Sequence, residues 1–228
     1  MEPVIREVAP GIIVAMAEDQ ICGTWVLYHG VSCFIVEMPP KAIDGDTIPA
    51  LLISKCIEEK WLIPVGLTFT HAHFDHIDGI SIYWDVLADY PDMKFICHES
   101  AIKFAPKLKT YFDTVFSEDI YETNIEGEPL YLIHAPKHSA SDVMIIFRGT
   151  MITGDWWLGW GDPNWNKIPA ATSIKSIDRL LEFLKNHRYV VTRLFSAHAN
   201  DFRYGVNVES VLLETRRYHE MKLEKERQ

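Results

Sequence analysis

Cysteine is scarce in this sequence, and its spacing excludes several kinds of site. The four cysteines form no CxxC pair, which excludes a zinc ribbon and a thioredoxin motif. No apolar run approaches the roughly 20 residues that a membrane span requires. The first residues lack the basic and apolar segments of a signal peptide. We therefore expect a cytoplasmic protein with reduced thiols and no membrane partner.

Basic residues are outnumbered by acidic ones. The 22 Lys and Arg residues against 32 Asp and Glu residues give a net charge of −10, which argues against a nucleic-acid partner because phosphate binding needs clustered positive charge. The chain also lacks repeats and linkers rich in Gly, Ser or Pro. Its 228 residues are 48% hydrophobic, which is typical of a globular protein. We expect one domain covering residues 1–228.

Short apolar segments alternate with helical patterns along the chain. Strands are predicted at residues 11–15, 24–28, 33–36, 63–70, 94–97, 130–134, 143–147, 151–153 and 189–195. Helices are predicted at 47–59, around 80–87, at 173–186 and from 208 onward. Residues 103–128 have weak periodicity and are interpreted as a loop with short helical pieces. The alternation predicts a layered α/β fold.

Histidine is the informative residue type. Residues 71–76 read HAHFDH and place His71, His73, Asp75 and His76 directly after an apolar strand. Neutral imidazoles and carboxylates are common ligands of zinc and similar metals. Residues at alternating positions of such a loop can point to one side, and the Asp75–His76 pair can serve a second metal. The alternative is a polar loop whose histidines are hydrogen-bonded structural residues.

Three further candidates stand at similar positions. His138 lies in APKHSASD, Asp155 in MITGDWW and His198 in LFSAHAND, each after an apolar strand. One such residue alone is usually just solvated. Together, ligands from several strand ends can meet at one sheet edge and form a preorganised site on rigid elements.

This order of residues resembles the metallo-β-lactamase fold superfamily, in its glyoxalase-II-like HxHxDH version. Thr70 before the first histidine and Gly79 after the motif also match. The resemblance implies an α/β fold, a four-layer αββα sandwich, with a dinuclear metal site at one edge. By the same resemblance, the first metal would be bound by His71, His73 and His138. The second metal would be bound by Asp75, His76 and His198, and Asp155 would bridge the two.

The resemblance also implies a reaction. The protein would be a dinuclear metal-dependent hydrolase that uses a metal-bound hydroxide on a small ester, thioester, lactone or lactam. Asp75 would orient the hydroxide. Two divalent metal ions are expected, Zn²⁺ first, with Fe or Mn also compatible. The alternatives are a diiron oxidoreductase on the same fold, whose flavodiiron branch has Glu in place of His73, and a member with a structural metal or none. We expect a small-molecule substrate, and a homodimer stays open.

Some features depart from the family pattern. Glu37 in VEMPP stands where the family often has Asp-Thr-Gly, and Ala199 follows His198 where Gly is common. Four tryptophans follow the bridging position and would either line the site or pack in the core: Trp156, Trp157, Trp160 and Trp165. The remaining histidines are expected to be structural or surface residues: His29, His98, His134, His187 and His219.

Overall fold

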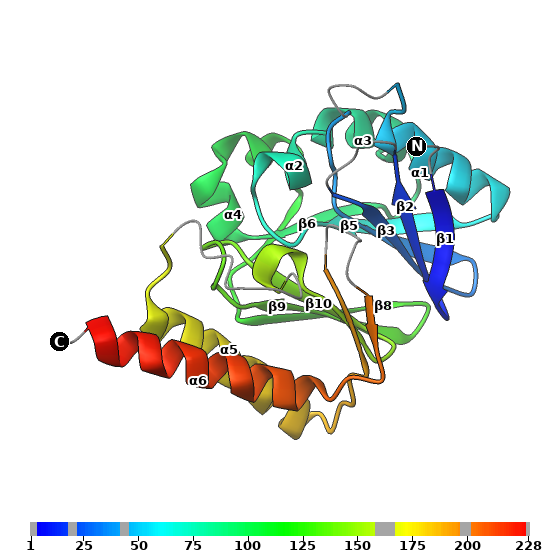
Figure 1. Cartoon of the computed structure of the whole chain (residues 1–228). Coiled ribbons are helices and arrows are strands. Elements are labelled where there is room, and N and C mark those ends of the chain that lie inside the picture. The colour runs from blue at the N-terminus through cyan, green and yellow to red at the C-terminus, as the bar shows by residue number, and fades with distance from the viewer. Residues whose placement is uncertain (1–3, 18–21, 42–45, 158–166, 197–201, 227–228) are drawn as a thin grey trace.

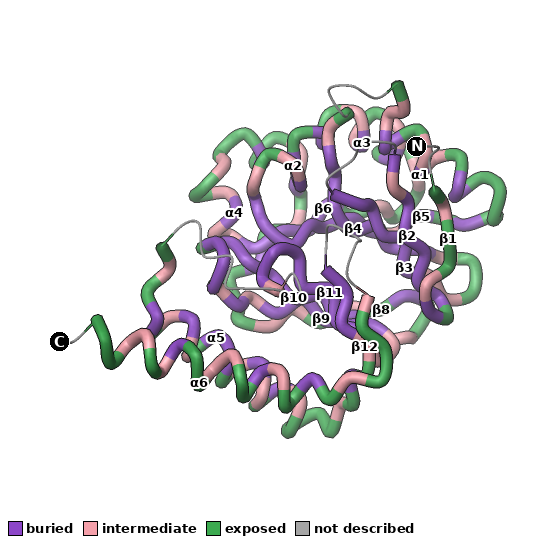
Figure 2. Tube along the Cα trace, viewed as in Figure 1, coloured by how far each residue is buried: buried purple, intermediate pink, exposed green. Residues whose placement is uncertain are grey.

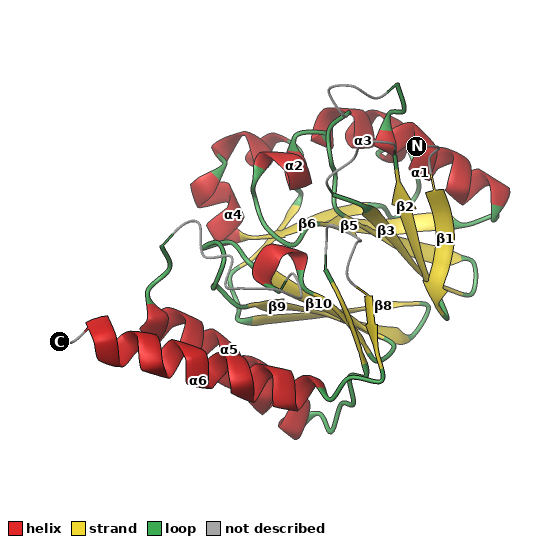
Figure 3. Ribbon diagram, viewed as in Figure 1, coloured by secondary structure: helices red, strands yellow, loops and turns green. Residues whose placement is uncertain are grey.

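Two β-sheets pack face to face, and helices cover the outer face of each sheet (Figure 1, Figure 3). The structure, a computed structural model, describes residues 4–17, 22–41, 46–157, 167–196 and 202–226. The layers run helix, sheet, sheet, helix. The expected four-layer αββα sandwich is therefore confirmed.

The first sheet contains seven strands in the order β1-β2-β3-β4-β5-β6-β7. Its pairs are antiparallel from β1 to β4 and parallel from β4 to β7. The parallel strands all end at one edge, and the loop with residues 71–76 follows β5 there. The strands are β1 Val4–Ala9, β2 Ile12–Met16, β3 Thr24–His29, β4 Ser32–Val36, β5 Ile63–Thr68, β6 Lys94–His98 and β7 Thr114–Phe116.

The second sheet contains six strands in the order β13-β12-β11-β10-β9-β8. Among its described strands, only β11 and β12 pair in parallel, so the segments after them leave the sheet at the same edge. The strands are β8 Ile120–Ile125, β9 Glu128–His134, β10 Val143–Phe147, β11 Thr150–Ile152, β12 Arg193–Phe195 and β13 Phe202–Tyr204.

Three apolar layers hold the sandwich together, and the central strands are buried (Figure 2). Between the sheets, side chains such as Trp25 and Phe34 pack against Ile145 and Phe195. On the outer face of the first sheet lie α1 (Pro49–Glu59) and α3 (Ile80–Leu87). On the second lie α5 (Ala170–Asn186) and α6 (Val208–Glu226), packed on each other. Burial of these faces is the main stabilising term for such a domain.

Several predicted boundaries were wrong. Residues 103–128 are not mainly loop, because they contain the 3₁₀ helix η1 (Pro106–Thr110), β7 and β8. The strand predicted at 189–195 is limited to β12, and the strand predicted at 63–70 ends at Thr68. α5 begins three residues before its predicted start, at Ala170. α1 begins at Pro49, two residues after its predicted start, with Ile48 as its N-cap.

All four cysteines are free and buried. Within the described ranges, no helix is both long enough and apolar enough to cross a membrane.

Candidate metal centre

The HAHFDH segment forms a turn between β5 and a short helix. His73 is the N-cap of α2 (Phe74–Ile77), which carries Asp75 and His76. Two backbone hydrogen bonds fasten this turn to the segment after β4: Met38 N donates to His76 O at 2.8 Å, and Gly79 N donates to Met38 O at 2.9 Å. The motif therefore sits on a backbone that the first sheet holds in place.

Three imidazoles meet at the open edge of the sandwich. His71 Nε2 lies 2.9 Å from His73 Nδ1, and His138 Nε2 lies 3.1 Å from the same His73 atom. His71 and His138 are buried, and His73 is half-buried. His71 and His73 follow β5 of the first sheet, and His138 follows β9 of the second. Their three nitrogen atoms converge on one point, which is the arrangement that a three-histidine metal site requires.

Asp155 connects this triad to a second group. It lies in the 3₁₀ helix η2 (Gly154–Trp156), just past β11. Its Oδ2 atom is 3.9 Å from His71 Nε2 and 3.7 Å from His138 Nε2. Its Oδ1 atom is 3.5 Å from His76 Nε2, and Asp75 Oδ2 is 3.6 Å from that same nitrogen. The two carboxylate oxygens of Asp155 thus face two different sets of ligands.

The surroundings set the charge of these imidazoles. Burial, followed by the neighbouring His76, lowers the pKa of His71 well below its usual value. His71 is therefore a neutral imidazole at neutral pH, which is the form that binds a metal. Burial also acts to lower the pKa of His76, but the facing carboxylates of Glu37 and Asp155 outweigh it and raise that pKa well above its usual value.

Cys22 and Glu37 lie behind His76 and were not predicted as a group. Glu37 Oε2 is 3.2 Å from His76 Nδ1, and Cys22 Sγ is 3.5 Å from it. Burial raises the pKa of the Cys22 thiol to about 12, so it stays protonated. The family resemblance predicts only that Glu37 stands where the Asp of an Asp-Thr-Gly segment is common. No spacing rule could reveal Cys22, which is 54 residues from its partner.

The loop that carries His138 is shaped by Asp142. One Asp142 oxygen, Oδ2, accepts hydrogen bonds from the backbone N–H groups of Lys137, His138 and Ser139, at 2.8, 2.6 and 2.9 Å. Ser141 Oγ accepts a hydrogen bond from Ala72 N at 3.0 Å, which ties this loop to the HAHFDH turn. Sequence analysis singles out neither residue. The role of Ser141 depends on a contact between the two sheets, whereas Asp142 acts within its own loop.

The remaining predicted residues fall in three classes. His198, Ala199, Trp160 and Trp165 lie outside the described residues. Trp156 is in the core against α5, and Trp157 packs half-buried on the same cluster. The other five histidines contribute to none of the candidate metal groups found among the described residues.

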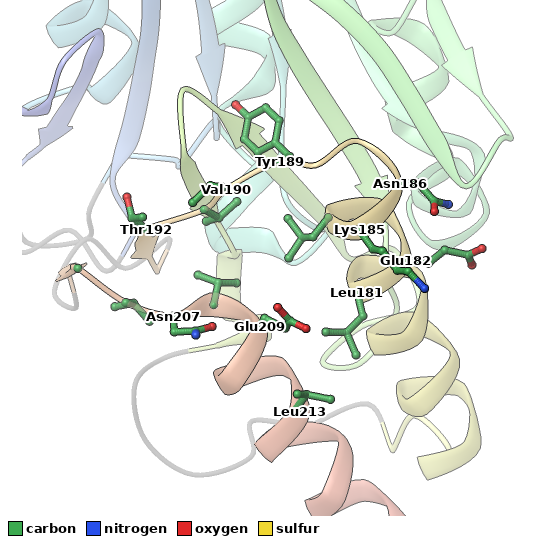
Figure 4. A pocket seen from close by; sticks show the side chains of 15 residues that line it. Leu181, Glu182, Lys185, Asn186, Tyr189, Val190, Thr192, Asn207, Glu209 and Leu213 are labelled. Carbon is green, nitrogen blue, oxygen red and sulfur yellow. The ribbon is translucent and has the colours of Figure 1, made fainter.

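A surface groove lies elsewhere on the molecule. A groove of about 830 Å³ lies between the end of α5 and the start of α6, where Leu181 and Leu213 face it (Figure 4). It shares no lining residue with the histidine and aspartate cluster. This groove is therefore separate from the candidate metal site.

Fold and site together define a class: the chain has the metallo-β-lactamase fold. The structure of the DIM-1 metallo-β-lactamase exposed to ceftazidime is similar with a TM-score of 0.74 at 13% identity, covering 97% of this chain and 98% of that one. The structure of TMB-1 has a TM-score of 0.72 at 12% identity, covering 97% and 99%. A metallo-β-lactamase from Hirschia baltica has a TM-score of 0.67 at 12% identity, covering 96% and 98%.

No family model matches the sequence, and no curated protein matches it. Identities this low show a common fold and leave the reaction to be argued from the site.

Proposed function

We propose that this protein is a hydrolase that depends on two divalent metal ions. The observation that carries the proposal is the position of Asp155, whose two oxygens face the triad of His71, His73 and His138 on one side and His76 on the other. The proposed ligands of the second metal are Asp75, His76 and His198, with Asp155 shared.

The donor atoms suit such ions. Imidazole nitrogens and carboxylate oxygens are typical ligands of Zn²⁺, and also of Fe and Mn. The low pKa of His71 keeps its imidazole neutral without any metal present, so binding there needs no proton release. Zn²⁺ is our first choice of metal. Iron bound in its place would support the oxidoreductase alternative.

Two metal ions at this edge would act as Lewis acids and lower the pKa of a water molecule towards neutrality. We assign to Asp75 the role of orienting that water, which its carboxylate beside His76 and its partly exposed side chain support. A carboxylate at this position can also receive the proton that the water loses. His73 is the accessible member of the triad, so substrate would approach on its side.

The proposed substrate is a small ester, thioester, lactone or lactam. A carbonyl group is the electrophile that this arrangement of Lewis acid, water and carboxylate can hydrolyse without a nucleophilic side chain. The net charge of −10 disfavours polyanionic substrates such as nucleic acids. We also propose that the whole chain acts as one domain.

The test is metal content combined with activity. Protein purified with ample zinc should hold about two ions per chain, and chelation should abolish turnover of a panel of esters, thioesters, lactones and lactams. Asp155→Ala removes the shared carboxylate, so at least one ion should be lost and kcat should fall at least ~100-fold. No metal above trace in the unmodified protein would overturn the proposal.

His134→Ala is the matched control. His134 is the last residue of β9, four positions from His138, and its Nε2 atom lies 2.9 Å from Ala140 O. Its loss should cost stability and leave about two ions per chain. If His134→Ala emptied the site while Asp155→Ala kept its metal and activity, the assignment of ligands would be wrong.

A further inference from the structure

An exposed aromatic ring borders the accessible side of the three-histidine cluster. Phe104 is the last residue of α4 (Glu99–Phe104) and is 50% exposed. Its ring centre lies 5.8 Å from that of His73, which is the half-buried member of the triad. Because the ring stands beside His73, a ligand held at the candidate metal site can cover its exposed face.

Side-chain contacts hold α4 against the metal loops. Ser100 is one helical turn before Phe104, so the two share a face of the helix. Ser100 Oγ lies 3.3 Å from His134 Nε2, and that nitrogen lies 2.9 Å from Ala140 O, in the loop that carries His138. The backbone that carries Phe104 is therefore held beside the metal loops.

We propose that Phe104 is a specificity-determining residue that binds the hydrocarbon part of an acyl substrate. This inference rests on the proposed function, since it takes the carbonyl group to be held beside the triad. A straight chain or ring attached to that carbonyl on the His73 side would cover the exposed face of Phe104. The preferred substrates would then be acyl compounds with an apolar group of about four carbons or more, and acetyl compounds would be poor substrates.

Phe74 is the competing candidate for the same role. It is 67% exposed and follows His73 in the chain. Among the described residues, however, the aromatic ring placed against His73 from outside the histidine cluster is that of Phe104. The two residues make opposite predictions, so one pair of variants separates them.

The experiment uses protein loaded with Co²⁺ and a series of n-alkanethiols from ethanethiol to hexanethiol. The thiolate binds the metal, and the visible spectrum of Co²⁺ reports binding without any turnover. Complete burial of one methylene tightens binding about fourfold. Contact with the Phe104 ring on one side of the chain should therefore give about twofold per methylene. We expect this dependence in the unmodified protein and in Phe74→Ala, part of it in Phe104→Leu, and none in Phe104→Ala.

The outcomes separate this inference from the proposed function. If Phe104→Ala keeps the full dependence on chain length, or the unmodified protein shows none, Phe104 has no such role while the metal site stands. If Phe74→Ala alone removes the dependence, the wall belongs to Phe74 and the inference is overturned. If the protein takes up no Co²⁺, or ethanethiol leaves the spectrum unchanged, both the proposed function and this inference fail.

Discussion

Glu37 offers the sharpest test of how the fold supports the candidate site. Its side chain is fully buried, and it contacts three hydrogen-bonding groups of the metal loop. Oε1 accepts from the Thr70 hydroxyl at 2.5 Å. Oε2 accepts from Thr70 N at 3.3 Å and faces His76 Nδ1 at 3.2 Å. A carboxylate there selects the His76 tautomer with hydrogen on Nδ1, which leaves Nε2 to bind a metal.

Two substitutions of Glu37 should lower the unfolding free energy by different amounts. In Glu37→Gln the amide can still meet all three groups, because the Thr70 hydroxyl can turn to accept, but the charge is lost. Charge-assisted hydrogen bonds contribute more than neutral ones, so we expect a loss of about 1–3 kcal/mol in unfolding free energy. Glu37→Ala leaves the same groups buried without their acceptor and should cost about 3–5 kcal/mol. Metal bound through His76 should weaken by about 10–100-fold in Glu37→Gln.

The assay has two parts. Urea unfolding of metal-free protein gives the free-energy change, and competition with a chromophoric chelator gives the affinity of each metal. Glu126→Gln is the matched control, because Glu126 also accepts two backbone N–H groups, at 3.0 and 2.9 Å, but is exposed. That control should have little effect on stability and none on metal affinity. If Glu37→Gln matched the unmodified protein in both measurements, our account of the His76 support would be refuted.

Two further predictions concern packing and pH. A Cβ atom at Gly79 would lie 2.3 Å from Pro39 O, so Gly79→Ala should cost about 1–3 kcal/mol in urea unfolding; an unchanged midpoint would contradict this close contact. Burial and the neighbouring His134 lower the pKa of His98 to about 4. As the pH drops from about 6.5 to 4, His98 is therefore protonated in the unfolded state before it is protonated in the folded state. The free energy of unfolding falls over that range. His98→Asn keeps an N-cap acceptor for Ser100 N and should remove about 1–3 kcal/mol of that loss in metal-free protein. An unchanged pH dependence in this variant would show that His98 titrates normally.

The strands that sequence analysis missed share one property: each is a sheet edge. They are β1, β7, β8 and β13, the terminal strands of the two sheets. β8 has the sequence IYETNI, and only its last residue is buried. Edge strands bury little, so their apolar alternation is weak, and only their partners define them. The central strands β5, β9 and β10 are mostly buried and stand out as apolar runs.

The candidate site was likewise predictable only in part. The residue types that could bind metal were predictable, because HAHFDH concentrates four of them within six positions. The hydrogen bonds that hold them were not, because most of these bonds join groups that are far apart in the sequence. Thr70 and Glu37 are 33 positions apart, and Ala72 and Ser141 are 69 apart. Sequence patterns report local periodicity and contain little information on such pairs.

Some of these long-range bonds also link the two sheets at the metal edge. Besides the bond between Ala72 and Ser141, Thr70 O accepts from Val143 N at 2.7 Å, which joins the turn after β5 to the start of β10. Within the second sheet, Lys137 Nζ donates to Trp156 O at 2.8 Å, which joins the loop of His138 to the helical turn of Asp155. The ligand loops are therefore fixed only when the sheets are packed on each other. Any metal bound by both sheets must stabilise their packing, since it binds the folded state and not the separated sheets.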